Sequence, residues 1–282
     1  MRTRKQRLQA VEGAATAVYT ALVRVFLDIG SHMGETILEA QQAKYGFDRI
    51  VCFEPASPCW PALQAIARKD PRVEICKFGL GREDGTIELH NPGNEGASII
   101  NGEGPVEEVQ IVDAAAWFRD NLHSTDFIVA KTNCEGAEVA IINRLLDAGL
   151  FSWAVTFLVT FDIRHFPEHR GEETKLRARL RRSGLRNFCF SDDVMIGTTH
   201  QRRIAHWLHL FGIDSGEGRP EVERTHAANF DRYSRKRGLH HRWEHALKDR
   251  FGYSALPEPI KAVLRSSKRR LGFTRERDVE QT

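Results

Sequence analysis

Short apolar runs alternate with amphipathic segments along the first 200 residues. Apolar runs of strand length, rich in β-branched and aromatic residues, occur at 23–27, 49–53, 73–78, 126–132 and 154–161. Helical spacing of apolar residues occurs at 35–45, 61–69, 113–121, 139–146 and 172–182. Strands that alternate with helices predict an α/β fold, an open and mainly parallel sheet with helices on both faces. Residues 188–190 and 194–197, joined by Ser-Asp-Asp, predict a terminal antiparallel hairpin.

The first apolar run leads into a glycine turn and then into a helical pattern. Asp28, Gly30 and Gly34 occupy this turn. Glycines let the backbone approach a ligand closely, and a helix N-terminus presents unpaired N–H groups. The spacing Asp-x-Gly-x-x-x-Gly differs from the Gly-x-Gly-x-x-Gly of dinucleotide folds. We therefore predict a ligand cradle here, with an ordinary structural turn as the alternative.

A second acidic residue follows the next strand. Glu54 lies 24 residues after Gly30, at a strand end, where open α/β sheets bind their ligands. A carboxylate there can accept hydrogen bonds from both hydroxyls of a ribose, and an exposed strand-end carboxylate is the alternative. Asp28 at the mouth of the turn would repel a phosphate. Asp28 and Glu54 together favour a cofactor that has a nucleoside and a cationic amino-acid part.

Four motifs in this order resemble the FkbM-type family of S-adenosylmethionine-dependent methyltransferases: VFLDIGSHMGE, VCFEP, VEICKFGLGREDGTIELH and DFIVAKTNCEGAEVAIINRLL. The resemblance covers roughly residues 23–199 and is most distinctive at Lys131-x-x-x-Glu135-Gly136-x-Glu138. It implies a Rossmann-like class I methyltransferase sheet and S-adenosyl-L-methionine as the cofactor. The expected acceptor is a hydroxyl of a sugar or secondary metabolite.

The resemblance also implies which residues form the site. Residues 131–138 would face the methyl group and the acceptor, which makes Lys131 and Glu135 catalytic candidates. The family usually has an aspartate where this chain has Asn133, and an amide can neither act as a base nor bind a cation as well. Cofactor contacts are expected from Asp28, Gly30, Ser31, His32, Met33, Gly34, Phe53, Glu54, Pro55, Phe78, Gly79 and Asn133.

Two polar residues after the fifth strand complete the catalytic candidates. Asp162 and His165 follow that strand and should lie on the cofactor side of the sheet. His165 is the expected base for an alcohol acceptor, because an ordinary histidine pKa of about 6.5 suits neutral pH. A surface histidine in a polar loop is the alternative. Lys131 could instead pair structurally with Glu135 or Glu138.

Charge divides the chain near residue 200. The net charge is +3, but residues 1–200 carry 23 basic and 27 acidic side chains, whereas residues 201–282 carry 18 and 11. We predict a leading helix at 1–22, a cofactor-binding domain at 23–200, and a basic, mostly helical extension at 201–282. Trp207 and Phe211 are apolar enough to pack against the domain. The basic residues could bind an acidic glycan, a membrane surface or nucleic acid, or be a solvated appendage.

Five scattered cysteines without a C-x-x-C pair, and no apolar run near the ~18–20 residues of a membrane span, predict a cytoplasmic protein without disulfides. No metal is predicted, because His240, His241 and His245 lack a clear acidic or cysteine partner. The expected partner is a small-molecule or glycan acceptor, with nucleic acid less favoured and the oligomeric state open. Two other functions stay open: a binding protein that keeps the fold without the chemistry, and a nicotinamide-dependent oxidoreductase, which the glycine spacing disfavours.

Overall fold

The computed structural model describes residues 22–94, 104–134, 136–163, 169, 171–195, 197–236 and 259. The strands are β1 (Arg24–Ile29), β2 (Arg49–Phe53), β3 (Val73–Cys76), β4 (Gly79–Gly81), β5 (Gly85–His90), β6 (Val106–Asp113), β7 (Phe127–Thr132), β8 (Ala154–Val159) and β9 (Phe188–Phe190). The α-helices are α2 (Glu35–Ala40), α3 (Trp60–Ala67), α4 (Ala114–Asn121), α5 (Glu138–Asp147), α6 (Glu172–Arg182), α7 (Ser191–Val194), α8 (His200–Leu210) and α9 (Arg219–Lys236).

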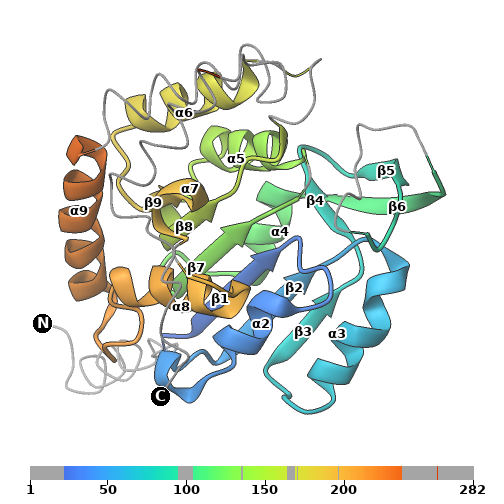
Figure 1. Cartoon of the computed structure of the whole chain (residues 1–282), viewed down its shortest axis with the longest axis horizontal. Helices are drawn as coiled ribbons and strands as arrows, with labels where there is room; N and C mark the ends of the chain where they lie inside the picture. The colour runs from blue at the N-terminus through green and yellow to red at the C-terminus, as the bar shows by residue number, and fades with distance from the viewer. Residues whose placement is uncertain are drawn as a thin grey trace, which may run out of the picture.

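Six strands form one sheet in the order β3-β2-β1-β7-β8-β9 (Figure 1). All neighbouring pairs are parallel, which confirms the predicted open α/β, Rossmann-like architecture. The strand order reverses between β1 and β7, and ligands of such sheets bind beyond the strand ends at that reversal. Asp28 of β1 lies in register with Lys131 of β7.

Helices cover both faces of this sheet. One face packs against α4, α5 and α6, and the other packs against α2, α3 and α8. Trp207 of α8 is fully buried, with its ring centroid 6.3 Å from that of Phe26 in β1. The extension therefore contributes α8 and α9 to the core that the sheet forms. A division of the chain at residue 200 stays a prediction, and most of residues 1–22 and 237–282 lies outside the described residues.

The predicted terminal hairpin is wrong. Phe188–Phe190 forms β9, which pairs with β8 in the parallel direction, and Ser191–Val194 forms the short helix α7. The helix α6 carries the chain back across the sheet, so β9 enters it in the same direction as β8. The Ser-Asp-Asp sequence that suggests a turn instead places acidic residues in the first turn of a helix, where the helix dipole favours them.

A second, three-stranded sheet lies at the side of the large one, in the order β4-β6-β5 (Figure 1). The sequence pattern does not predict β6, because polar side chains interrupt its apolar positions and several of its residues are exposed. It also misses α9, although Pro220 in the first turn and the spacing of Val222, His226 and Phe230 are helix signals. The Asp113 carboxylate caps α4, since it accepts two backbone N–H bonds at the start of that helix.

Candidate functional site

A cavity of about 420 Å³ lies at the carboxyl ends of β1, β2 and β7. Its walls come from the turn after β1, the ends of β2 and β7, the small sheet, and the first residue of α8. Nine of the residues expected to bind the cofactor or act in catalysis line it: Gly30, Ser31, His32, Phe53, Glu54, Pro55, Gly79, Lys131 and Asn133.

The glycine turn is fixed against the strands on either side of it. Gly30 has a φ of +83°, and a Cβ at this position would lie 1.9 Å from the carbonyl oxygen of Asn133. The N–H groups of Gly30 and Ser31 both donate to the carbonyl oxygen of Phe53, and the N–H of Asn133 donates to that of Ile29. Only glycine fits this close approach, so the turn joins the ends of β1, β2 and β7 into one rigid floor for the cavity.

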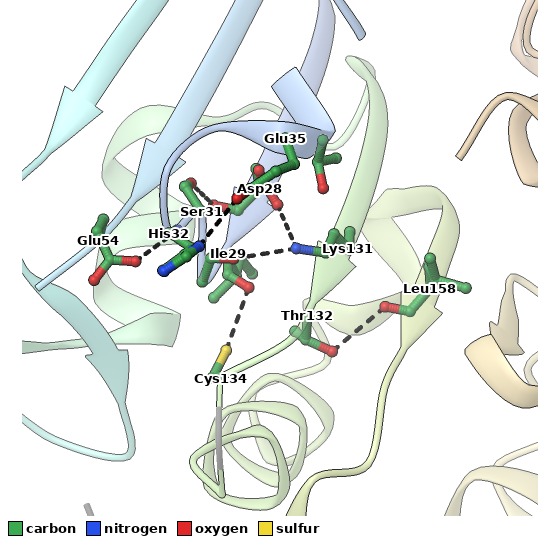
Figure 2. Close-up of polar contacts among 12 residues, drawn as sticks. Asp28, Ile29, Ser31, His32, Glu35, Glu54, Lys131, Thr132, Cys134 and Leu158 are labelled. Carbon is green, nitrogen blue, oxygen red and sulfur yellow. Dashed lines mark hydrogen bonds and ion pairs between the residues drawn. The ribbon is translucent and has the colours of Figure 1, made fainter. Parts of the chain in front are cut away.

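Glu54 is held at the end of β2 with its carboxylate in the cavity wall. Its Oε2 accepts the backbone N–H of His32 at 2.7 Å (Figure 2). Its Oε1 accepts the backbone N–H of Ala56 at 2.9 Å. The residue is 7% exposed. Burial raises the pKa of Glu54, and the two N–H donors oppose that shift. Each oxygen keeps a second lone pair, so the carboxylate can accept two further hydrogen bonds from a ligand.

Asp28 and Lys131 form a buried ion pair beneath the cavity. The Lys131 Nζ donates to Asp28 Oδ1 at 2.9 Å and to the carbonyl oxygen of Gly30 at 3.1 Å (Figure 2). Lys131 is 4% exposed and Asp28 is 0% exposed. Burial raises the pKa of Asp28, and the Lys131 ammonium opposes that shift. Lys131 therefore neutralises Asp28 and holds the turn, and its third N–H remains as a donor beyond these two bonds.

Glu138 fastens the turn between β7 and α5 to the end of β8. Its Oε1 accepts the N–H groups of Asp162 and Ile163, both at 2.8 Å, and its Oε2 accepts that of Gly136 at 2.9 Å. The residue is fully buried, and burial raises its pKa to about 7, with Asp162 adding to the shift. The Glu138 carboxylate thus joins the turn before α5 to the segment that follows β8. The structural pairing of Lys131 is with Asp28, not with Glu138.

His32 connects the glycine turn to the loop after β5. Its Nδ1 lies 3.1 Å from Glu35 Oε1, and its Nε2 lies 3.3 Å from the carbonyl oxygen of Gly93. All three residues line the cavity. His32 also has a φ of 49°, which residues other than glycine adopt rarely. The ring therefore forms a side wall that ties the residue 91–94 loop to the cavity floor.

Several expected site residues lie elsewhere. Asp28 is buried behind Lys131, Met33 is 37% exposed, and Gly34 packs against Ile66. Phe78 packs edge-on against Phe53, with ring centroids 6.1 Å apart. None of these four is among the residues that line the cavity.

Three catalytic candidates remain besides Lys131: Glu135, Asp162 and His165. Asp162 lies beside Glu138 rather than in the cavity wall. Glu135 and His165 lie outside the described residues. Their predicted roles, and those of the residues in the cavity wall, stay predictions.

The cavity has walls that sequence reasoning missed. An apolar wall comes from the small sheet: Leu80, Ile87, Leu89, Val109 and Ile111. A polar wall comes from the start of α2 and from His200, the first residue of α8. His200 Nε2 lies 2.8 Å from Thr36 Oγ1. Thr36 falls one residue after the quoted glycine motif and could have been included, but nothing in the local sequence around His200 signals a site.

The described residues contain neither a group of side chains that could bind a metal ion nor a helix that could span a membrane. Within them, no three His, Cys, Asp or Glu side chains are grouped so that they could bind a metal ion. His240, His241 and His245 lie outside this set. None of the helices that the structure describes has the length and apolar character to cross a membrane.

No protein-family model matches the sequence, and no curated protein matches it. Among solved structures, the chain is similar to the methyltransferase FkbM from Methylobacillus flagellatus KT, at 18% sequence identity and a TM-score of 0.32. The alignment covers 45% of this chain and 30% of that chain. That protein carries the name of the family that the motifs resemble. At this distance the likeness carries no weight for function, which therefore rests on the cavity itself.

Proposed function

We propose that the protein is an S-adenosyl-L-methionine-dependent methyltransferase. The observation that carries this proposal is the placement of Glu54. Its carboxylate is buried at the end of β2, is oriented by two backbone N–H donors, and lines the cavity above the glycine turn. A carboxylate in this setting can accept hydrogen bonds from two adjacent ribose hydroxyls.

The charges of the cavity favour a sulfonium cofactor over a dinucleotide. Two carboxylates, Glu35 and Glu54, line it. The ammonium of Lys131 is paired with Asp28, so it leaves little net positive charge for a diphosphate. A cofactor with a cationic sulfur and an amino-acid part fits such a cavity, whereas a nicotinamide dinucleotide would bring two phosphates beside these carboxylates.

The cavity also offers a place for each end of such a cofactor. Pro55, Gly79 and Leu80 form an apolar rim beside Glu54, which suits an adenine ring. Lys131 and Asn133 line the cavity at the β7 end. We expect the amino-acid part and the methyl group to lie on that side. When bound, the cofactor would supply an electrophilic methyl carbon. The residues of this chain would position it and its acceptor in line.

The acceptor is proposed from the resemblance of the motifs. We expect a hydroxyl of a sugar or secondary metabolite, in a cytoplasmic reaction. Asn133 supports a second candidate, a protein that keeps the cofactor site but acts as a binding module for nucleic acid or another partner. Asn133 lines the cavity, and its amide cannot serve as a base.

The first test is calorimetric titration with S-adenosylhomocysteine. The wild-type protein should bind it, and Glu54→Ala should bind it about 10–150-fold more weakly, because a charge-assisted hydrogen bond contributes roughly 1.5–3 kcal/mol. Glu74→Ala is the matched control, since the Glu74 side chain on β3 is 44% exposed and pairs with Arg49 of β2. Equal affinity of Glu54→Ala and the control, with both proteins folded by circular dichroism, would contradict the site.

A second test separates the enzyme from the binding module. Transfer of a labelled methyl group to acceptors, screened with the wild-type protein, supports the enzyme. Binding of S-adenosylhomocysteine without turnover, together with turnover by Asn133→Asp, would favour the binding module. Absence of binding by the folded wild-type protein would exclude both the methyltransferase and the binding module that keeps the cofactor site.

A further inference from the structure

His200 brings a titratable ring into the cavity from a distant part of the chain. It is the first residue of α8, a helix anchored by the fully buried side chains of Ile204, Trp207 and Leu208. This anchoring places the ring of His200 in the cavity wall near Lys131 and Thr36. The position is therefore set by core packing, and the helix cannot shift without disturbing the core.

The ring is oriented by one hydrogen bond. His200 Nε2 lies 2.8 Å from Oγ1 of Thr36, and Thr36 is 2% exposed in the first turn of α2. His200 Nδ1 has no hydrogen-bond partner within the described part of the chain, and it is not a buried atom. In the neutral tautomer that donates Nε2–H to Thr36, Nδ1 carries an accessible lone pair on a residue that lines the cavity.

The groups around the ring favour its neutral form. Lys131 of β7 and Arg203 of α8 lower the pKa of His200, and Asp28 of β1 and Glu35 of α2 raise it. Burial is the largest effect, and the pKa of His200 lies below its ordinary value of 6.5. The imidazole is therefore unprotonated at neutral pH, which is the state that a base needs.

We propose that His200 is the general base that accepts the proton of the methyl acceptor. This role rests on the proposed methyl transfer to a hydroxyl. The acceptor oxygen forms a bond to the methyl carbon while the carbon–sulfur bond breaks. The electron pair of the broken bond stays on sulfur. The hydroxyl proton passes to Nδ1 of His200, which becomes an imidazolium. The nearby Lys131 ammonium destabilises that imidazolium, so the proton then leaves to solvent.

The test compares His200→Gln with His209→Gln. Glutamine at 200 can still donate to Thr36 but cannot act as a base, and the His209 side chain is 77% exposed on the same helix. In His200→Gln we expect S-adenosylhomocysteine affinity within about threefold of wild type and kcat lower by about 10²–10⁴-fold. The wild-type decrease of kcat at acidic pH should be absent in His200→Gln. His209→Gln should match wild type in all three measurements.

A second measurement needs no acceptor. The His200 ring resonances, assigned by their loss in His200→Gln, should titrate below pH 6.5 and shift when S-adenosylhomocysteine saturates the protein. Resonances that do not move on saturation would overturn the proposal, because the ring would then lie away from the ligand. A wild-type kcat and pH profile in His200→Gln, or loss of turnover in His165→Gln alone, would also overturn it while leaving the methyltransferase intact. Failure of the wild-type protein to bind would instead remove the proposed function.

Discussion

His226 of α9 makes the stability of the fold depend on pH. The ring is 1% exposed, its Nε2 lies 2.8 Å from Thr156 Oγ1 in β8, and it stacks on Phe211 with centroids 3.9 Å apart. Burial lowers the pKa of His226 from 6.5 to about 3. The folded protein therefore keeps this ring neutral at pH values where the unfolded chain protonates it.

The sign and size of the effect follow from this difference. Above pH 6.5 the ring is neutral in both states, and its contribution to stability is complete. As the pH falls from 6.5 towards 3, only the unfolded chain gains the proton, so the free energy of unfolding decreases. At about 1.36 kcal/mol for each pKa unit, the loss is about 2 kcal/mol at pH 5 and about 4 kcal/mol at pH 3.

Glu138 acts in the opposite direction over part of this range. Its pKa is raised from 4.5 to about 7, so the folded protein binds this proton more tightly than the unfolded chain does. Glu138 therefore adds stability as the pH falls from 7 to 4.5. The pH curve of the wild-type protein alone does not separate the two residues, and a variant comparison is required.

Urea denaturation of the wild type and His226→Gln at pH 8 and pH 5 isolates the histidine. Glutamine can keep the hydrogen bond to Thr156 but does not titrate. We expect the free-energy advantage of the wild type over the variant to shrink by about 2 kcal/mol between pH 8 and pH 5. His209→Gln, on the exposed side of α8, should run parallel to wild type. Parallel pH dependence of His226→Gln and wild type would refute the reasoning.

Two further predictions concern the floor of the cavity. Gly30→Ala and Gly149→Ala both place a Cβ at positive φ, but only the first meets another atom, the Asn133 carbonyl oxygen. Thermal unfolding should show Gly30→Ala about 1–3 kcal/mol less stable than Gly149→Ala, and equal losses would contradict the close approach. Lys131→Met leaves Asp28 buried without its cation and should cost about 3–5 kcal/mol in urea denaturation. Adding Asp28→Asn should recover most of that loss, and a single variant as stable as the double would disprove the pairing.

The strand ends could be predicted from the sequence because each depends on local pattern. An apolar run followed by Asp28 and Gly30 identifies the end of β1, and Glu54 falls at the end of β2 in the same way. Parallel strands bring such ends to one edge of a sheet, so the cavity floor follows from short motifs at the strand ends. The positive φ of Gly30 and the cap at Asp113 likewise follow from residue type.

Contacts between distant segments could not be read in this way. The partner of Lys131 is Asp28, 103 residues away, and the parallel register of β1 and β7 selects it over the nearby Glu138. Thr36 and His200 are 164 residues apart and meet only because α8 packs against the sheet face that α2 covers. Periodicity indicates which side of an element is buried, but not which other element buries it.

The sequence by itself thus determined the alternation of strands and helices, the glycine turn, and the carboxylate of Glu54 at a strand end. Tertiary structure decided the parallel direction of β9, the apolar wall from β5 and β6, and the entry of His200 into the cavity. The physical reason is the range of the interactions. Backbone conformation and burial pattern depend on a few neighbouring residues, whereas register, crossover direction and cavity walls depend on how complete elements pack together.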